Sequence, residues 1–173
     1  MSYLLMSLFA LAIVAADQVT KYLTVASIEL GGVKEFIPGL LRFTYVQNTG
    51  GGFSILTGHT WLLVAVSLLA FAMIFYVIYK KYVTGAGTLW SLFAVLGGGV
   101  GNLIDRVRLG YVVDMIETEF ISFPVFNVAD CFITCGAVGL CVFMILEEKK
   151  EKARRAAQAD EATDAEPAGE DAP

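Results

Sequence analysis

The chain has 173 residues, of which 57% are hydrophobic, and a formal net charge of −5. Soluble domains average about 45–50% apolar residues, so this composition is typical of a membrane protein. Residues 147–173 hold nine acids and five bases, so the rest of the chain is nearly neutral and has no basic stripe for a nucleic acid.

The first predicted membrane span covers residues 2–25. Its uninterrupted apolar part, residues 3–16, has the length of a signal-peptide core. No lysine or arginine precedes this part, however, and apolar residues continue beyond Asp17. We therefore favour an uncleaved span over a signal peptide.

Three further spans are predicted at residues 61–79, 89–109 and 125–146. The first of these has no charge and can cross a hydrocarbon core of roughly 30 Å. Before it, Pro38-Gly39 marks a turn, and residues 41–46 alternate as a short strand would. We expect an all-α membrane protein of four transmembrane helices, with a small extracytoplasmic β element between spans one and two. Residues 1–146 form this membrane domain, and residues 147–173 form a charged, disordered tail.

Lysine and arginine residues near the span ends predict the orientation of the chain in the membrane. Two follow the second span, Lys80 and Lys81, and five more lie between residues 149 and 155, after the fourth span. The opposite side carries fewer. Both termini are therefore expected in the cytoplasm.

Polar side chains of the predicted spans gather at one depth, in the half of the membrane away from the cytoplasm. Ionisable groups inside a membrane are rare and are functional candidates by default. Asp114 lies just beyond Gly110, which ends the third span, at the same surface. The polar residues within the spans are Asp17, Lys21, Asn102, Asp105, Arg106, Asn127 and Asp130.

Several of these groups also have a structural interpretation. Asp17 and Lys21 are four residues apart and can form an ion pair that only stabilises a helix near the interface. We interpret Asp105 as an ordinary interfacial charge beside two arginines. The glycines at 97, 98, 99 and 101 are interpreted as packing residues that let the third span approach a neighbour closely. Ser122 and Pro124 are a plausible start for the fourth helix.

The chemistry of the predicted site follows from the residues available. His59 is the only histidine, and no zinc-protease motif or serine elbow is present. The three cysteines lie in one apolar run without a base, and no metal or other cofactor is expected. Asp114 and Asp130 remain, and two facing carboxylates that share one proton can activate water, as in aspartic proteases.

Five segments resemble, in order, the motifs of the lipoprotein signal peptidases, the type II signal peptidases of bacteria. Any one segment is a weak signal, but five in order between residues 3 and 146 are specific. One departure is Gly51-Gly52, where the family more often has alanines. The segments are Asp17-Gln-Val-Thr-Lys21, Asn48-Thr-Gly-Gly-Gly-Phe53, Gly98-Gly-Val-Gly-Asn-Leu-Ile-Asp-Arg106, Gly110-Tyr-Val-Val-Asp114 and Phe126-Asn-Val-Ala-Asp130.

The resemblance implies an aspartyl endopeptidase of the bacterial inner membrane, with its active site near the outer face. Its substrates would be diacylglyceryl-modified prolipoproteins, cut just before the lipidated cysteine, and it would contact membrane lipids and act as a monomer without a cofactor. Asp114 and Asp130 would be catalytic. The residues that would bind substrate or shape the site are Asp17, Lys21, Asn48, Gly50, Asn102, Arg106 and Asn127.

Two other classes of function remain open at this stage. Buried carboxylates also serve proton-coupled transporters, although these polar residues do not form a path across the membrane. A non-catalytic assembly factor would leave the two aspartates without a role. The segment from Asn48 to Phe53 can also be only a flexible turn.

Overall fold

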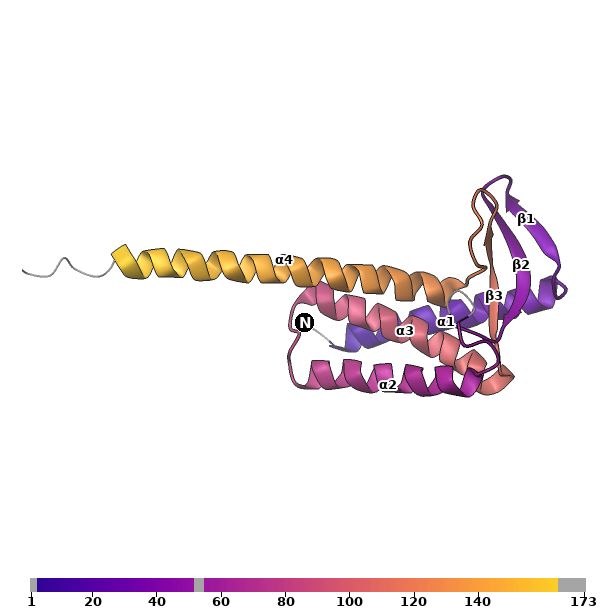
Figure 1. Cartoon of the computed structure of the whole chain (residues 1–173), viewed down its shortest axis with the longest axis horizontal. Helices are drawn as coiled ribbons and strands as arrows, with labels where there is room; N and C mark the ends of the chain where they lie inside the picture. The colour runs from indigo at the N-terminus through magenta and orange to yellow at the C-terminus, as the bar shows by residue number, and fades with distance from the viewer. Residues whose placement is uncertain (1–2, 52–54, 165–173) are drawn as a thin grey trace, which may run out of the picture.

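The structure is a computed structural model that describes residues 3–51 and 55–164. Within these ranges, four helices are long and apolar enough to cross a membrane, as the sequence predicts. They lie side by side, and one extends far beyond the others (Figure 1). The helices are α1 (Tyr3–Ser27), α2 (Thr60–Tyr79), α3 (Ala86–Leu109) and α4 (Val128–Asp164).

Helix α3 packs against each of the other three helices. Its glycines allow this close approach, because a Cβ atom at Gly97 would lie 2.9 Å from the carbonyl oxygen of Ala10 in α1. A Cβ atom at Gly98 would lie 2.4 Å from the carbonyl oxygen of Ala129 in α4. The prediction that the glycines of this span serve close packing is confirmed for both positions.

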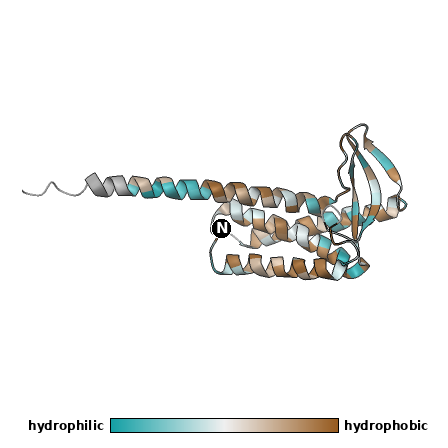
Figure 2. Ribbon diagram, in the orientation of Figure 1, coloured by the Kyte–Doolittle hydropathy of each residue, from teal (hydrophilic) through white to brown (hydrophobic). Residues whose placement is uncertain are grey.

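The outer surfaces of the helices are apolar. None of the residues of α2 is buried, although this helix is almost wholly hydrophobic. Figure 2 shows the hydrophobic residues along the four helices, with hydrophilic residues at the sheet end and on the extension of α4. This distribution suits helices whose outer faces contact lipid.

A three-stranded antiparallel sheet lies at one end of the helices (Figure 1). Its strands, in spatial order, are β1 (Val33–Ile37), β2 (Leu41–Asn48) and β3 (Val112–Thr118). β2 confirms the strand predicted at residues 41–46. The sheet does not lie wholly between spans one and two, however, because β3 follows α3. Residues 112–115 of this strand are all buried, so they lack the polar–apolar alternation that would have revealed it.

The start of the fourth helix was predicted too early. Phe126 still belongs to the sheet, because its backbone N–H and C=O both bond to Ile116, at 3.0 and 2.7 Å. These bonds hold the chain extended beyond Ser122 and Pro124, and α4 begins only at Val128.

The predicted disordered tail is wrong for residues 147–164, because α4 continues to Asp164. This segment is rich in alanine, glutamate, lysine and arginine, all strong helix formers. Glu148 also pairs with Lys152, and Glu151 with Arg155, each one helical turn apart. Residues 165–173 lie outside the described part of the chain.

Candidate active site

Asp114 and Asp130 line the same cavity, which has a volume of about 860 Å³. Asp114 is on β3, opposite Val46 of β2. Gly110 ends α3 with a φ of +81°, a conformation that glycine adopts without strain. This sharp end lets the chain turn back and enter β3 within two residues, at the depth of the polar groups of α3.

The Asp114 carboxylate is nearly inaccessible to solvent and is held by two amides. Asn48 donates a hydrogen bond to its Oδ2 at 2.9 Å, and Asn127 donates one to its Oδ1 at 2.6 Å. Burial raises the pKa of Asp114 to about 6, and the negative charge of Asp130 also raises it. The two amides and the charge of Lys21 act in the opposite direction. Asp114 can therefore change its protonation state near neutral pH.

Asp130 is fixed by the first turn of α4. Its backbone N–H donates to Oδ1 of Asn127 at 2.9 Å, and its own Oδ2 accepts from the backbone N–H of Asn127 at 3.2 Å. This reciprocal pair is a capping box, with Asn127 at the N-cap and Asp130 three residues later. The helix start thus orients the carboxylate.

Two asparagine side chains connect the aspartates. The Asn127 amide that bonds Asp114 also donates to Oδ1 of Asn102, at 3.1 Å. The amide of Asn102 in turn donates to Oδ1 of Asp130, at 2.8 Å. All four carboxylate oxygens of Asp114 and Asp130 therefore accept a hydrogen bond, which leaves both side chains little freedom to rotate.

Lys21 is the centre of a second, fully buried layer behind the aspartates. Its Nζ lies 2.9 Å from Oδ2 of Asp17 and 3.1 Å from Oδ2 of Asp105. It also donates to Oδ1 of Asn102 at 2.9 Å. The predicted pairing of Asp17 with Lys21 is confirmed, but the pair does more than stabilise α1, because it joins α1 to α3.

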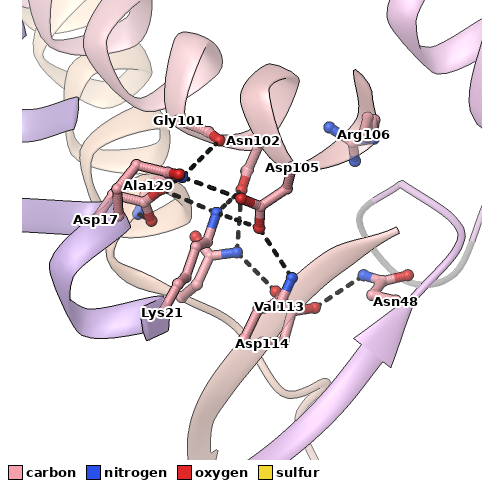
Figure 3. A network of polar contacts seen from close by, with 12 residues as sticks. Asp17, Lys21, Asn48, Gly101, Asn102, Asp105, Arg106, Val113, Asp114 and Ala129 are labelled. Atoms are coloured by element: carbon pink, nitrogen blue, oxygen red, sulfur yellow. Dashed lines mark hydrogen bonds and ion pairs between the residues drawn. The ribbon is translucent and has the colours of Figure 1, made fainter. Parts of the chain in front are cut away.

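The two carboxylates of this layer each bind the backbone beside one of the site aspartates (Figure 3). Asp105 accepts from the N–H of Val113, the residue before Asp114. Asp17 accepts from the N–H of Ala129, the residue before Asp130. The buried layer thereby connects to both β3 and α4.

Arg106 and the segment after β2 form one side of the site. Arg106 donates through Nη2 to the carbonyl oxygen of Gly50 at 3.1 Å, and the N–H of Gly50 donates to Oδ1 of Asn48 at 2.9 Å. These bonds give residues 48–50 a defined conformation, in contrast to the flexible turn that the sequence also allowed. Gly52 and Phe53 lie outside the described residues.

The structure brings together all nine residues that the sequence analysis placed at the site. Asp105 lies with them, and its interpretation as an ordinary interfacial charge is wrong, because this residue is buried and paired with Lys21. Gln18 was not predicted as a site residue, although it donates to both Asp17 and Asp105, at 3.2 and 3.0 Å. The spacing of Asp105, three residues after Asn102, was a signal that it shares the helix face of the site.

Within the described ranges, no group of three or more histidine, cysteine, aspartate or glutamate side chains is arranged to hold a metal ion. The donors around Asp114 and Asp130 are amides, a lysine and an arginine. Such a set stabilises carboxylates by hydrogen bonds and positive charge.

Comparisons with known proteins agree with the geometry. A family model described as signal peptidase (SPase) II matches residues 9–146. The lipoprotein signal peptidase of Enterococcus faecalis is 43% identical over 145 residues, which cover 84% of this chain and 90% of the relative. One from Streptococcus pyogenes is 42% identical over 139 residues, which cover 79% and 90%.

Solved structures are also similar to this chain. A bacterial membrane enzyme determined by the in meso method at 2.3 Å resolution gives a TM-score of 0.77 at 30% identity and covers 86% of this chain and 90% of its own. A second, at 1.9 Å resolution, gives a TM-score of 0.72 at 30% identity and covers 82% and 90%.

Proposed function

This chain belongs to the signal peptidase II family, and on that premise we propose that Asp114 and Asp130 are the carboxylates with which it activates water. The protein is a multi-pass bacterial membrane enzyme that removes signal peptides from prolipoproteins. This family membership excludes the two alternative functions, a proton-coupled transporter and a non-catalytic assembly factor. The bond that it cuts precedes the diacylglyceryl-modified cysteine of the substrate.

One observation carries the assignment of the catalytic pair. Asn127 bonds Asp114 with its side-chain amide and caps Asp130 with its backbone N–H and its Oδ1. A single residue therefore holds both carboxylates toward one cavity. Asp114, with its pKa raised to about 6, is suited to keep a proton that the pair can use.

The reaction needs one ionised and one protonated carboxylate. The ionised group accepts a proton from water as the water oxygen attacks the carbonyl carbon of the scissile peptide. The protonated group gives its proton to the carbonyl oxygen, which otherwise would become an oxyanion. When the tetrahedral intermediate collapses, the C–N bond breaks, and the leaving amine takes the proton that the first carboxylate accepted from water. The second carboxylate recovers its proton from a hydroxyl of the intermediate.

The remaining site residues position the pair and the substrate. Asn48, Asn102 and Asn127 orient the two carboxylates. Arg106 holds Gly50 and faces the cavity, where it can bind a peptide carbonyl oxygen. The buried layer of Asp17 and Lys21, together with Asp105, fixes the elements that carry the pair.

The charges at the two ends of the helices support an orientation in the membrane. Lys80 and Lys81 directly follow α2, whose C-terminal end lies opposite the sheet, as does the basic extension of α4 (Figure 1). This distribution supports a cytoplasmic location for that end. The site then lies near the outer face, where the lipidated end of an exported substrate is anchored. A reporter fused after Lys81 should be cytoplasmic and one placed near Gly32 external; the reverse pattern would contradict this orientation.

The structure supports three further assignments. We propose that the protein acts as a monomer, because one chain supplies both carboxylates and the described residues that hold them. Residues 3–146 contain every described residue of the site, and we assign the peptidase domain to residues 1–146. Membrane lipids contact the outer apolar faces of the helices.

The catalytic pair is tested by Asp114→Asn and Asp130→Asn, singly and together. Each variant should insert and bind a diacylglyceryl-modified precursor but not cleave it, because asparagine nearly keeps the shape and cannot transfer the proton. The double variant should be no slower than either single one, since groups that act as a unit are not additive. Cleavage within about tenfold of the unaltered protein, a loss of only ~1.4 kcal/mol, would show that another group supplies the chemistry.

A further inference from the structure

Helix α4 carries two cysteine side chains on the wall of the active-site cavity. Cys131 follows Asp130 directly, and Cys135 lies one helical turn further into the membrane on the same face. Both are free thiols. The proposed reaction uses water and two carboxylates, so these two nucleophilic groups have no part in it.

The cavity reaches past the aspartates to these thiols. Beyond the carboxylates it continues between α2, α3 and α4, where its lining includes Ser67, Gly99 and Thr134. Two of these residues carry hydroxyl groups, so this part of the wall is not wholly apolar. The whole cavity has a volume of about 860 Å³, which is within the range of pockets that bind drug-sized molecules, roughly 300–1,000 Å³.

We propose that this part of the α4 wall is a covalent modification site for apolar α,β-unsaturated carbonyl compounds, which react at Cys135 and more slowly at Cys131. The sulfur forms a bond to the β carbon of the electrophile, the C=C π bond breaks, and the proton of the thiol goes to the α carbon. The reaction needs no oxidant or reductant. The adduct occupies the cavity and prevents the substrate from binding there. This consequence rests on the proposed function of the cavity.

Accessibility decides the order of the two thiols. Cys135 is exposed, whereas Cys131 is only partly exposed and lies in the first turn of the helix. A reagent dissolved in the membrane therefore reaches Cys135 first. The third thiol, Cys141, is on the same helix and is also exposed, but it does not line the cavity. It is a matched control.

The test uses full-length variants that each keep one cysteine, with alanine at the other two positions, and a variant with alanine at all three. Each is treated in detergent with N-cyclohexylmaleimide, and cleavage of a diacylglyceryl-modified precursor is compared with that of the same variant untreated. Intact mass reports the adduct. The variant with Cys135 alone should lose at least about tenfold in rate, or ~1.4 kcal/mol. The variants with Cys141 alone and with no cysteine should keep their rates.

Three outcomes would overturn the proposal: a complete adduct at Cys135 with undiminished cleavage, no adduct at Cys135, or equal inhibition of the cysteine-free variant. A second measurement does not depend on catalysis. In an Asp130→Asn background, bound precursor should slow adduct formation at Cys135, and an unchanged rate would place this thiol off the substrate path. Failure of the proposed function would instead appear in untreated protein, as cleavage by the Asp114→Asn or Asp130→Asn variant.

Discussion

Asp105 accepts a hydrogen bond at 3.0 Å from the backbone N–H of Val113, the residue that precedes Asp114. Asp17 binds the N–H of Ala129 in the same way, also at 3.0 Å, and Ala129 precedes Asp130. Lys21 lies between the two carboxylates. One buried cation therefore connects, through two carboxylates, the backbones that carry both proposed catalytic groups.

The first prediction follows from this connection. Asp105→Ala removes both the acceptor of the Val113 N–H and a charge partner of Lys21. The position of β3 relative to α3 should therefore be less well fixed. We expect kcat to fall by about 10- to 100-fold, or ~1.4–2.7 kcal/mol. Asp105→Asn keeps an acceptor oxygen but not the charge, and its loss should be smaller. Cleavage kinetics with a lipidated precursor would measure both.

Arg108→Gln is the control for this experiment, because Arg108 is an exposed charge near the same end of α3. It should change kcat little. If Asp105→Ala cleaved as fast as Arg108→Gln, the original interpretation of Asp105 as an interfacial charge would be restored.

The second prediction concerns pH and stability. The folded protein raises the pKa of Asp114 from 3.8 to about 6, mainly through burial. Folding therefore favours the protonated carboxyl: its contribution to stability is complete below the ordinary pKa and is lost as pH rises through about 6. Asp114→Asn does not ionise. Its Tm relative to the unaltered protein should accordingly rise between about pH 4 and pH 6 and level off above that range. A difference in Tm that stayed constant or fell over this range would contradict the raised pKa.

The third prediction tests the contact between α3 and α4. Alanine at Gly98 would place its Cβ 2.4 Å from the backbone carbonyl oxygen of Ala129, which cannot move without shifting the first turn of α4. Gly98→Ala should therefore lower both Tm and cleavage. At Gly99 a Cβ would meet only the ring of Phe71, at 2.7 Å, and a ring can turn aside. Gly99→Ala should therefore lower Tm less than Gly98→Ala. Equal decreases in Tm would show that the contact with the Ala129 backbone is not the cause of the destabilisation.

The fourth prediction concerns the opposite end of the bundle. Thr88 donates to Oε1 of Glu147 at 2.7 Å, and the Glu147 carboxylate lies over Gly85, where α3 starts without a side-chain cap. A carboxylate is stabilising at a helix N-terminus. Glu147→Ala should destabilise the protein by about 1 kcal/mol, measured by thermal unfolding in detergent.

Glu148→Ala provides the comparison, because Glu148 is exposed and, among the residues that the structure describes, forms an ion pair within α4, with Lys152. Exposed ion pairs contribute little, so its Tm should hardly change. Equal effects of the two substitutions would mean that Glu147 does not join α4 to α3.

The candidate catalytic pair was predictable because ionisable residues in an apolar chain are few. Their positions along the spans also predicted a common depth, since each residue of a helix advances the chain by about 1.5 Å. The pairing of Asp17 with Lys21 followed from a spacing of four residues. These features depend on near neighbours along the chain, and the structure agrees with them.

The roles of Asp105 and Asn127 could not be read from the chain in this way. The bond from Ala129 to Asp17 joins residues 112 positions apart, and it exists because α1 and α4 pack next to each other against the glycines of α3. β3 likewise has no periodic signal, because its residues 112–115 are buried on both faces. Periodicity records which faces of an element are apolar, whereas the partner of a buried polar group is decided by helix packing. Local sequence therefore determined the spans and the depth of the site, and tertiary packing decided which buried groups hold its two aspartates.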